Sequence, residues 1–196
     1  MYRYLGLAFA LALGGCTSNT VSNLHYTPTV SVQAASSATI GSVTATDQRK
    51  EAANRLATIM GGYGNPLKTL DTAKPVKDEV ADAFTEGLRV RGLLAPGAAG
   101  PFRLSLVVRR FDSDQYMGRG ARIDVGMSVI DNAGRTVFDD SAKSDISEAE
   151  FFQTGILANI QDLQRLSETV LDRAIDQLLD KPAFRAAVAK PSGAGS

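Results

Sequence analysis

The stretches FRLSLVVRRF (102–111) and ARIDVGMSVI (121–130) decide the fold, because apolar and polar residues alternate along both of them. A period of two is typical of a β-strand that buries one face and leaves the other in water. The apolar positions are Phe102, Leu104, Leu106 and Val108 in the first stretch and Ile123, Val125, Met127 and Val129 in the second. We therefore expect two neighbouring strands that face one core.

A third strand is expected directly after them. DNAG (131–134) predicts a turn in which Gly134 takes the left-handed position, and RTVFDDSAKSDI (135–146) predicts a weaker strand at the edge of the sheet. Two signals then conflict. Ser147 and Glu150 form a capping-box pattern that would start a helix near residue 148, whereas Gly155 and its neighbours favour a strand that ends near residue 152. We favour the strand.

Two segments have helical spacing. Pro75 suits a first helical turn and Gly92 suits the exit of one helix, while Lys181 and Pro182 end a second helix over residues 158–180. Their apolar stripes are Val76, Val80, Ala83, Phe84 and Leu88 in the first helix and Ile160, Leu163, Leu166, Val170, Ala174 and Leu178 in the second.

The segment before the first helix gives a mixed signal. ATIGSVTATD (38–47) predicts a strand, and residues 48–74 predict an irregular, mobile loop because Gly61, Gly62 and Gly64 interrupt them. The DQR sequence at 47–49 has two interpretations. Asp47 and Arg49 pair locally, or they help form a recognition loop with GGYGNP (61–66). We favour local pairing.

The predicted order is β-α-β-β-β-α, which indicates an α+β domain over residues 38–189. We expect a two-layer sandwich with a mainly antiparallel sheet and both helices on one face. The other face of the strands is polar and is either solvated or available to a partner. It carries Arg103, Ser105, Arg109, Arg122, Asp124 and Ser128.

The N-terminus predicts an exported protein. Residues 1–15 contain Arg3, a nine-residue apolar run (5–13) and two glycines, which is the pattern of a cleaved signal peptide. The run is too short to span a bilayer. A short buried helix is the alternative. Cys16 is the single cysteine, so an internal disulfide is excluded, although a free or intermolecular thiol remains an alternative.

Leu13-Gly14-Gly15-Cys16 resembles the lipobox of bacterial lipoproteins. The resemblance implies cleavage between Gly15 and Cys16, a diacylglyceryl thioether on Cys16 and an amide-linked acyl chain such as palmitate. Several acyl chains hold a protein stably on a membrane. Thr17 follows Cys16 where an Asp would imply retention in the inner membrane, so the resemblance implies the outer membrane, with the domain in the periplasm.

The segments that flank the domain are polar. Residues 16–37 predict a flexible tether, in which His25 is expected to be solvated, and residues 190–196 predict a disordered tail. Arg and Lys balance Asp and Glu at 21 each, so no net charge favours nucleic acid.

The chain offers little for catalysis. We expect no cofactor and no metal site, because one His and one Cys cannot form a zinc cluster and DSDQYMG (112–118) lacks the later ligands of a calcium loop. The pattern G-x-S-x-G is absent. The acidic run at Asp139, Asp140, Asp145, Glu148 and Glu150 is interpreted as an exposed strand rather than an acid–base site.

Four arginines are the most suggestive polar group. Arg109, Arg110, Arg119 and Arg122 surround the second predicted hairpin, and the planar guanidinium suits phosphates and carboxylates. This group is either a contact for lipid headgroups or a partner, or a solvated hairpin balanced by Asp112, Asp114 and Asp124.

The order of elements resembles the YajG-type family of bacterial lipoproteins over residues 38–185. The matching features are the lipobox, a strand that runs into ATDQR, a glycine-containing loop, and a helix with LRVRGL before the next strands. The resemblance implies a periplasm-facing outer-membrane lipoprotein with no established enzyme activity. Our leading hypothesis is a non-enzymatic, lipid-anchored protein that binds an envelope partner or stabilises an envelope assembly. A weaker resemblance is to auxiliary lipoproteins of ABC-type transport systems, and an unrecognised periplasmic enzyme is the third hypothesis.

Overall fold

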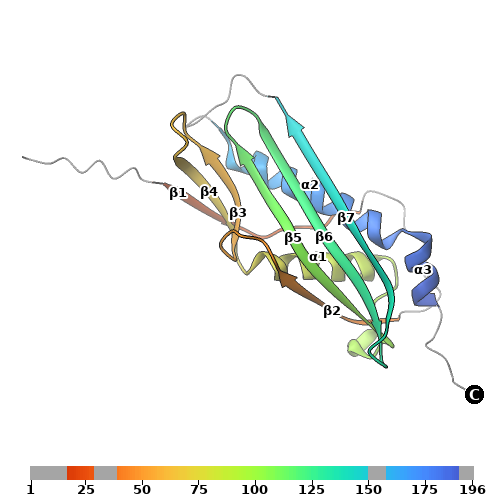
Figure 1. The fold of residues 1–196 in the computed structure, drawn as a ribbon. Helices are drawn as coiled ribbons and strands as arrows, with labels where there is room; N and C mark the ends of the chain where they lie inside the picture. The colour runs from red at the N-terminus through yellow and green to blue at the C-terminus, as the bar shows by residue number, and fades with distance from the viewer. Residues whose placement is uncertain (1–16, 29–38, 150–157, 190–196) are drawn as a thin grey trace, which may run out of the picture.

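The computed structural model describes residues 17–28, 39–149 and 158–189. Within them a seven-stranded sheet carries helices on one face (Figure 1). The strands are β1 (Ser18–Ser22), β2 (Ile40–Asp47), β3 (Arg55–Met60), β4 (Pro66–Thr72), β5 (Phe102–Gln115), β6 (Arg119–Asp131) and β7 (Thr136–Glu148). The helices are α1 (Val76–Val90), α2 (Ile160–Leu179) and α3 (Pro182–Ala189), with a short 3₁₀ helix at Pro96–Ala98.

The strands β5, β6 and β7 form the expected antiparallel meander. Gly134 lies in the turn between β6 and β7 with φ of 79°, and β7 lies at the edge of the sheet. β7 continues to Glu148, so residues 147 and 148 belong to the favoured strand and not to a helix; the expected strand end near residue 152 lies outside the described residues. Helix α2 begins at Ile160, where the Asn159 side chain accepts a hydrogen bond from the backbone N–H of Gln161.

One edge of β5 binds two parallel strands in succession. β2 pairs with residues 102–108 of β5, and β3 pairs with residues 113–115. Residues 48–54 leave the sheet between them. The length of β5 therefore allows one strand position to be filled by two separate segments.

Arg49 joins these two segments. Its fully buried guanidinium donates hydrogen bonds to the carboxylate of Asp47, at 2.9 and 3.0 Å, and to the carbonyl oxygen of Arg55 on β3 at 2.8 Å. It also donates to the carbonyl oxygen of Phe111 on β5 at 3.2 Å. The local interpretation of Asp47 and Arg49 is confirmed.

The expected irregular loop at residues 48–74 is wrong. Most of it is the antiparallel hairpin of β3 and β4, which buries Leu56, Ile59 and Leu70. The glycines occupy only the turn, where Gly64 has φ of 76°. Glycine and proline in the turn give this segment the composition of a loop, although a short strand lies on either side of the turn.

The expected flexible tether is also wrong for its described part, residues 17–28. β1 pairs in parallel with β4, from Ser18 opposite Lys68 to Ser22 opposite Thr72. This strand has no alternating apolar pattern, because its backbone hydrogen bonds rather than its side chains attach it to the sheet edge. Residues 29–37 lie outside the described residues, as do the signal peptide, Cys16 and the C-terminal tail.

The sheet is mixed and not mainly antiparallel. In the described part of the chain, the pairings β1–β4, β2–β5 and β3–β5 are parallel, and three others are antiparallel. The element order is β-β-β-β-α-β-β-β-α-α rather than β-α-β-β-β-α. The α+β class is confirmed, whereas the sheet order differs because β1, β3 and β4 are additional.

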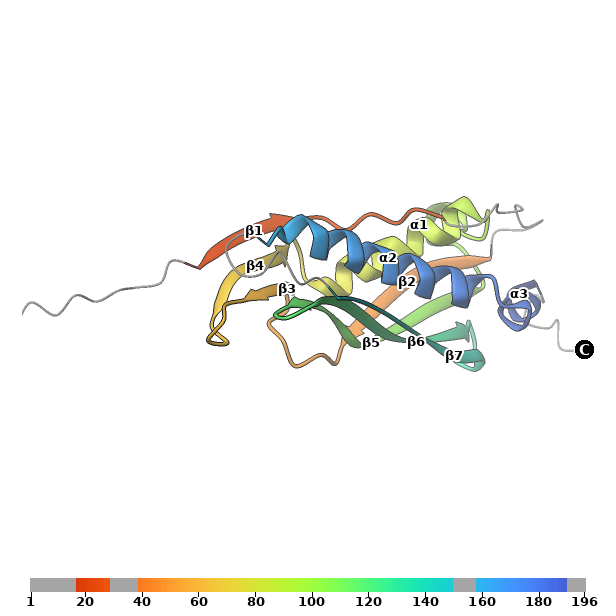
Figure 2. The same ribbon diagram turned by 90° about the horizontal axis from the view of Figure 1, so that it is seen from above.

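The helices α1 and α2 lie on the same face of the sheet, as expected, and touch where Gly87 meets Ile175 (Figure 2). Every apolar residue predicted to line their inner stripes is buried. Helix α3 was not expected. Its Phe184 packs edge-to-face on Phe138 of β7, with ring centroids 5.7 Å apart. Pro182 therefore begins a new helix in addition to ending α2.

Candidate functional site

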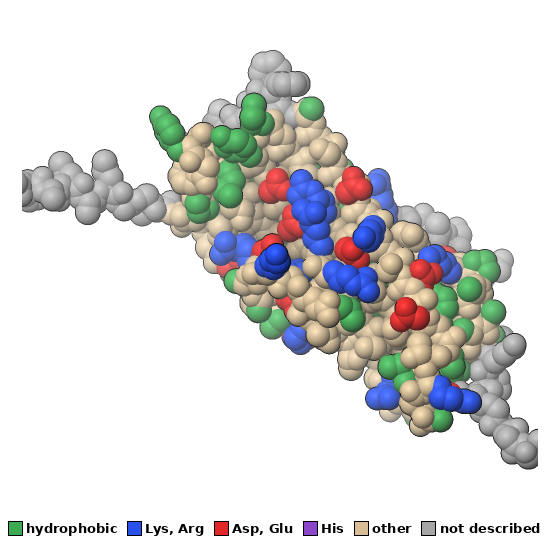
Figure 3. Space-filling model, viewed as in Figure 1, with side chains coloured by type: hydrophobic (Ala, Val, Ile, Leu, Met, Phe, Trp, Pro, Cys, Tyr) green, Lys and Arg blue, Asp and Glu red, His purple; other side chains and the backbone are tan. Residues whose placement is uncertain are grey.

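The face of the sheet away from the helices carries charged side chains of both signs (Figure 3). We call them the charged band, because they follow β5, β6 and β7 across the middle of this face. The polar face predicted from alternation is confirmed, since none of its predicted residues is buried. The charged band consists of Arg109, Arg110, Asp112, Asp114, Arg122, Asp124, Lys143 and Asp145.

A β-bulge turns two consecutive arginines to this face. The register of β5 against β6 shifts between Val108 and Arg110, so Val108 and Phe111 are buried while Arg109 and Arg110 are exposed. The Arg109 guanidinium lies over Gly126. A Cβ atom on that glycine would be 2.7 Å from Nη2 of Arg109, so the missing side chain provides the space for the guanidinium.

Ion pairs fix the arginines of the charged band. Arg110 pairs with Asp112 at 2.6 Å, and Arg122 pairs with Asp114 at 2.6 Å and with Asp112 at 3.1 Å. These hydrogen bonds raise the pKa of both guanidinium groups above its ordinary value. The pairing reduces the entropy that the side chains would lose on meeting a partner.

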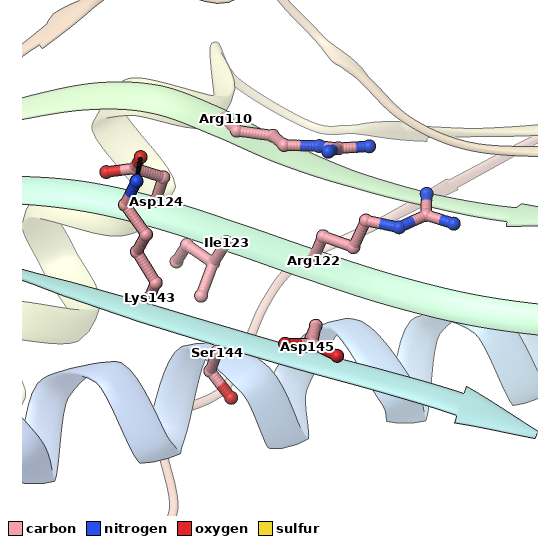
Figure 4. A pocket seen from close by; sticks show the side chains of 7 residues that line it. All are labelled: Arg110, Arg122, Ile123, Asp124, Lys143, Ser144 and Asp145. Atoms are coloured by element: carbon pink, nitrogen blue, oxygen red, sulfur yellow. Dashed lines mark ion pairs between the residues drawn. The ribbon is translucent and has the colours of Figure 1, made fainter.

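A shallow hollow of about 330 Å³ opens within the charged band (Figure 4). Arg110 and Arg122 extend side by side along it, and Lys143 pairs with Asp124 at 3.1 Å. Asp145 makes no ion pair within the described residues. The hollow thus offers positioned charges of both signs. It is lined by Arg110, Arg122, Ile123, Asp124, Lys143, Ser144 and Asp145.

Arg119 does not belong to this group. It lies on the helix-facing side of β6 and donates hydrogen bonds to Glu148 of β7 at 2.6 Å and to Asp162 of α2 at 2.9 Å. Its side chain is only 13% exposed. The structure brings three of the four predicted arginines together and makes the fourth a connection between the sheet and α2.

The acidic run of β7 is divided between the two faces of the sheet. Asp139 accepts a hydrogen bond from Ser128 on the open face, whereas Asp140 pairs with Lys181, which follows α2. Glu150 lies outside the described residues. The alternation of the strand therefore keeps these carboxylates from gathering at one point.

A second polar site lies over the helices, where sequence reasoning expected none. Residues 23–28, which we call the strap, leave β1 and run along α1 and α2 on the side away from the sheet (Figure 2). Their backbone N–H groups donate to helix carboxylates: Leu24 to Glu79 at 3.3 Å and Thr27 to Asp172 at 3.2 Å. The strap therefore binds both helices.

Arg91 lies at the centre of this second site, and its side chain is fully buried. It donates hydrogen bonds to Asp176 at 2.8 Å, to Asp180 at 2.6 and 3.0 Å, and to the Tyr26 hydroxyl at 2.8 Å. Burial alone would raise the pKa of Asp180, but the hydrogen bonds from Arg91 and Arg185 outweigh it and hold that pKa low. Such a buried charge requires this complete set of partners.

Asp172 is the titratable group of this site. Burial raises its pKa to about 7, and the negative charges of Asp176 and Glu168 act in the same direction, while the Thr27 N–H opposes them. One sequence signal could have located the site. Asp172, Asp176 and Asp180 recur every four residues and so share one side of α2.

The described residues offer neither a metal-binding cluster nor a membrane-spanning helix. They contain no cluster of three or more His, Cys, Asp or Glu side chains arranged to hold a metal ion. None of their helices is both long and apolar enough to cross a membrane.

The chain matches no protein-family model and no curated protein sequence. It is similar in structure to protein XCC0632 of Xanthomonas campestris, assigned to the family DUF330, with a TM-score of 0.57 and 15% identity over 86% of this chain and 96% of that one. This likeness shows the fold.

Lower similarity extends to two other bacterial structures. One is PelC from Paraburkholderia phytofirmans, solved as a dodecamer (TM-score 0.43, 12% identity, 74% of this chain and 92% of that one). The other is a minor lipoprotein from Acinetobacter baumannii (TM-score 0.41, 15% identity, 57% of this chain and 89% of that one).

Proposed function

We propose that this protein is a non-enzymatic lipoprotein of the bacterial envelope, anchored through Cys16 in the outer membrane and facing the periplasm. The observation that carries the proposal is the lipobox directly before the first strand. Thr17, one residue after Cys16, donates a hydrogen bond to the Pro66 carbonyl at 3.4 Å, and β1 begins at Ser18. A lipid on Cys16 would therefore hold the domain against the bilayer, without a long tether.

The role of the domain in this proposal is to bind a partner protein of the envelope through the charged band. Its charges of both signs are already positioned by ion pairs, which suits a polar protein surface more than a small apolar ligand. The division of the β7 carboxylates between two faces supports the absence of an acid–base site. The YajG-type assignment remains part of the proposal and rests on the motifs quoted above.

Replacing Cys16 by Ser tests the anchor. We expect the C16S variant to lose labelling by radioactive palmitate and to leave the outer-membrane fraction, while the unchanged protein keeps both. Persistent labelling of C16S, or sedimentation with the outer membrane despite the loss of label, would contradict the proposal. A Thr17→Asp variant is the matched control, because it keeps the acylated cysteine and tests only the sorting to the outer membrane.

Purification of the lipidated protein from detergent-solubilised membranes separates the partner hypotheses. We expect an envelope protein to co-purify with the unchanged chain and to be lost from an Arg110→Glu, Arg122→Glu variant, since the two substitutions reverse the charge of the hollow. A stoichiometric permease or ATPase among the co-purified proteins would instead favour the auxiliary lipoprotein of an ABC-type transport system.

A further inference from the structure

Two hairpin turns form one exposed surface at an end of the sheet. They are residues 61–66, between β3 and β4, and residues 116–118, between β5 and β6; we call them the tip surface. β3 runs parallel to β5, so both turns leave the sheet at the same end. The Tyr116 hydroxyl donates a hydrogen bond to the Gly62 carbonyl at 3.2 Å, which joins the two turns.

The tip surface is apolar and uncharged. Tyr63 is fully exposed, and Met117 and Tyr116 are 77% and 44% exposed. Neither turn contains an acidic or basic residue. Figure 3 shows hydrophobic side chains gathered at this end, apart from the charged band in the middle of the face. Exposed aromatic and apolar side chains that gather in one place mark an interaction surface.

The N-terminus of the domain emerges beside this surface. Thr17 touches Pro66 of the β3–β4 hairpin, and Ser18 pairs with Lys68 on the next strand. Cys16 precedes Thr17 by one residue, a Cα step of about 3.8 Å. A lipid attached to Cys16 would therefore enter the bilayer next to the two turns, and the membrane is the surface nearest to them.

We propose that the tip surface docks on the bilayer that holds the lipid of Cys16, with Tyr63 and Met117 inserted into its interfacial layer. The proposal rests on the proposed function in one respect, the lipid on Cys16. Tyrosine suits this depth, because its ring is apolar and its hydroxyl remains hydrated. Docking fixes the orientation of the domain: the β6–β7 turn points away from the membrane, and the charged band faces sideways, open to a partner.

An environment-sensitive fluorophore on a single introduced cysteine tests this orientation. Met117→Cys and, at the opposite end of the sheet, Asn132→Cys place the fluorophore at exposed positions where folding does not depend on the side chain. Each lipidated protein is extracted, labelled and reconstituted into phosphatidylcholine vesicles with or without spin-labelled lipid. The acylated Cys16 does not react with the label, so only the introduced thiol carries the fluorophore.

We expect the Met117→Cys probe to shift to the blue and to be quenched severalfold more by spin-labelled lipid than the Asn132→Cys probe. High salt should not change this difference, because the tip surface carries no cation. Equal quenching at the two positions, quenching of the Met117→Cys probe by iodide in water, or loss of the lipid signal at high salt would overturn the docking.

Flotation of the same vesicles separates the two proposals. If the protein floats with the vesicles but the Met117→Cys probe remains in water, the anchor holds and the tip surface does not dock. If the protein does not float, or if Cys16 reacts with the label, the anchor itself fails. If the probe on Met117→Cys is shielded from both quenchers in native membranes but not in vesicles, a protein partner covers the tip surface and the docking is overturned.

Discussion

At the scale of single residues, the site around Arg91 depends on charges held away from water. Arg91 is fully buried between Asp176 and Asp180, and Tyr26 of the strap completes its hydrogen bonds. A buried pair of this kind is costly to break, because the remaining partner keeps an uncompensated charge. Asp172 lies one turn away on the same helix side and has no arginine partner of its own among the described residues.

Asp172 should therefore make the protein less stable as the pH rises. Its pKa of about 7 in the folded state exceeds the ordinary 3.8, so the folded protein holds the proton more tightly than the unfolded chain. The resulting stabilisation is fully present below about pH 4 and is lost as the pH rises through 7. Asp172→Asn keeps an acceptor for Thr27, and we expect it to raise the unfolding free energy at pH 8 by up to about 4 kcal/mol.

Urea titrations at pH 5 and pH 8 measure this effect. The increase in unfolding free energy caused by Asp172→Asn should be larger at pH 8 than at pH 5. Glu51→Gln, on the exposed surface, should change the unfolding free energy little at either pH. An equal effect of Asp172→Asn on the unfolding free energy at pH 5 and pH 8 would show that the Asp172 carboxyl does not titrate between these two pH values.

Arg109 and Arg119 form a matched pair for a second prediction. Arg119→Ala removes two partly buried ion pairs and should lower the unfolding free energy by about 1–3 kcal/mol. Arg109→Ala removes one exposed pair with Asp124 and should cost less than about 0.5 kcal/mol. Thermal denaturation measures both variants. An equal loss of stability in Arg119→Ala and Arg109→Ala would contradict the placement of Arg119 between the sheet and α2.

The expectation that all four arginines share one surface failed at Arg119 for a simple reason. The alternation of β6 already assigns Arg119 to the same side as Ile123, which is buried, and assigns Arg122 to the other side. Nearness of these arginines in the sequence therefore does not place all four on one face. The other three arginines lie on one face of the sheet, where a β-bulge exposes Arg109 and Arg110 together.

At the scale of elements, long segments with one buried face were predictable and short polar ones were not. β5, β6, α1 and α2 have apolar residues at regular spacing, and the structure confirms them. β3 and β4 are short and flank a glycine-rich turn, so composition favoured a loop. β1 and the strap have few apolar residues, and the carboxylates that hold the strap lie more than fifty residues away in the chain.

The strap gives a prediction at this scale. Replacing residues 17–28 by twelve Gly and Ser residues removes β1, the buried Leu24 and the bonds to Glu79 and Asp172. We expect the unfolding free energy to fall by about 2–4 kcal/mol, because apolar burial and charged hydrogen bonds are lost together. Denaturation that is unchanged by the replacement would instead support a flexible tether.

At the scale of the whole molecule, a single residue, Thr17, separates the proposed anchor at Cys16 from the first strand. Thr17 is bound to the β3–β4 hairpin, so the start of β1 and the tip surface lie at one end of the domain. The charged band lies on the sheet face of the domain, and the strap lies on the opposite face, over the helices. A lipid on Cys16, as proposed, would place the proposed partner surface beside the membrane instead of far above it.

The mass of the mature protein, extracted from membranes, is the sharpest test of the proposed anchor. We expect the first residue to be Cys16, and the N-terminal peptide to carry the added mass of a diacylglyceryl group and one amide-linked acyl chain. A mature chain that begins at Met1, or one that begins elsewhere with an unmodified Cys16, would contradict it.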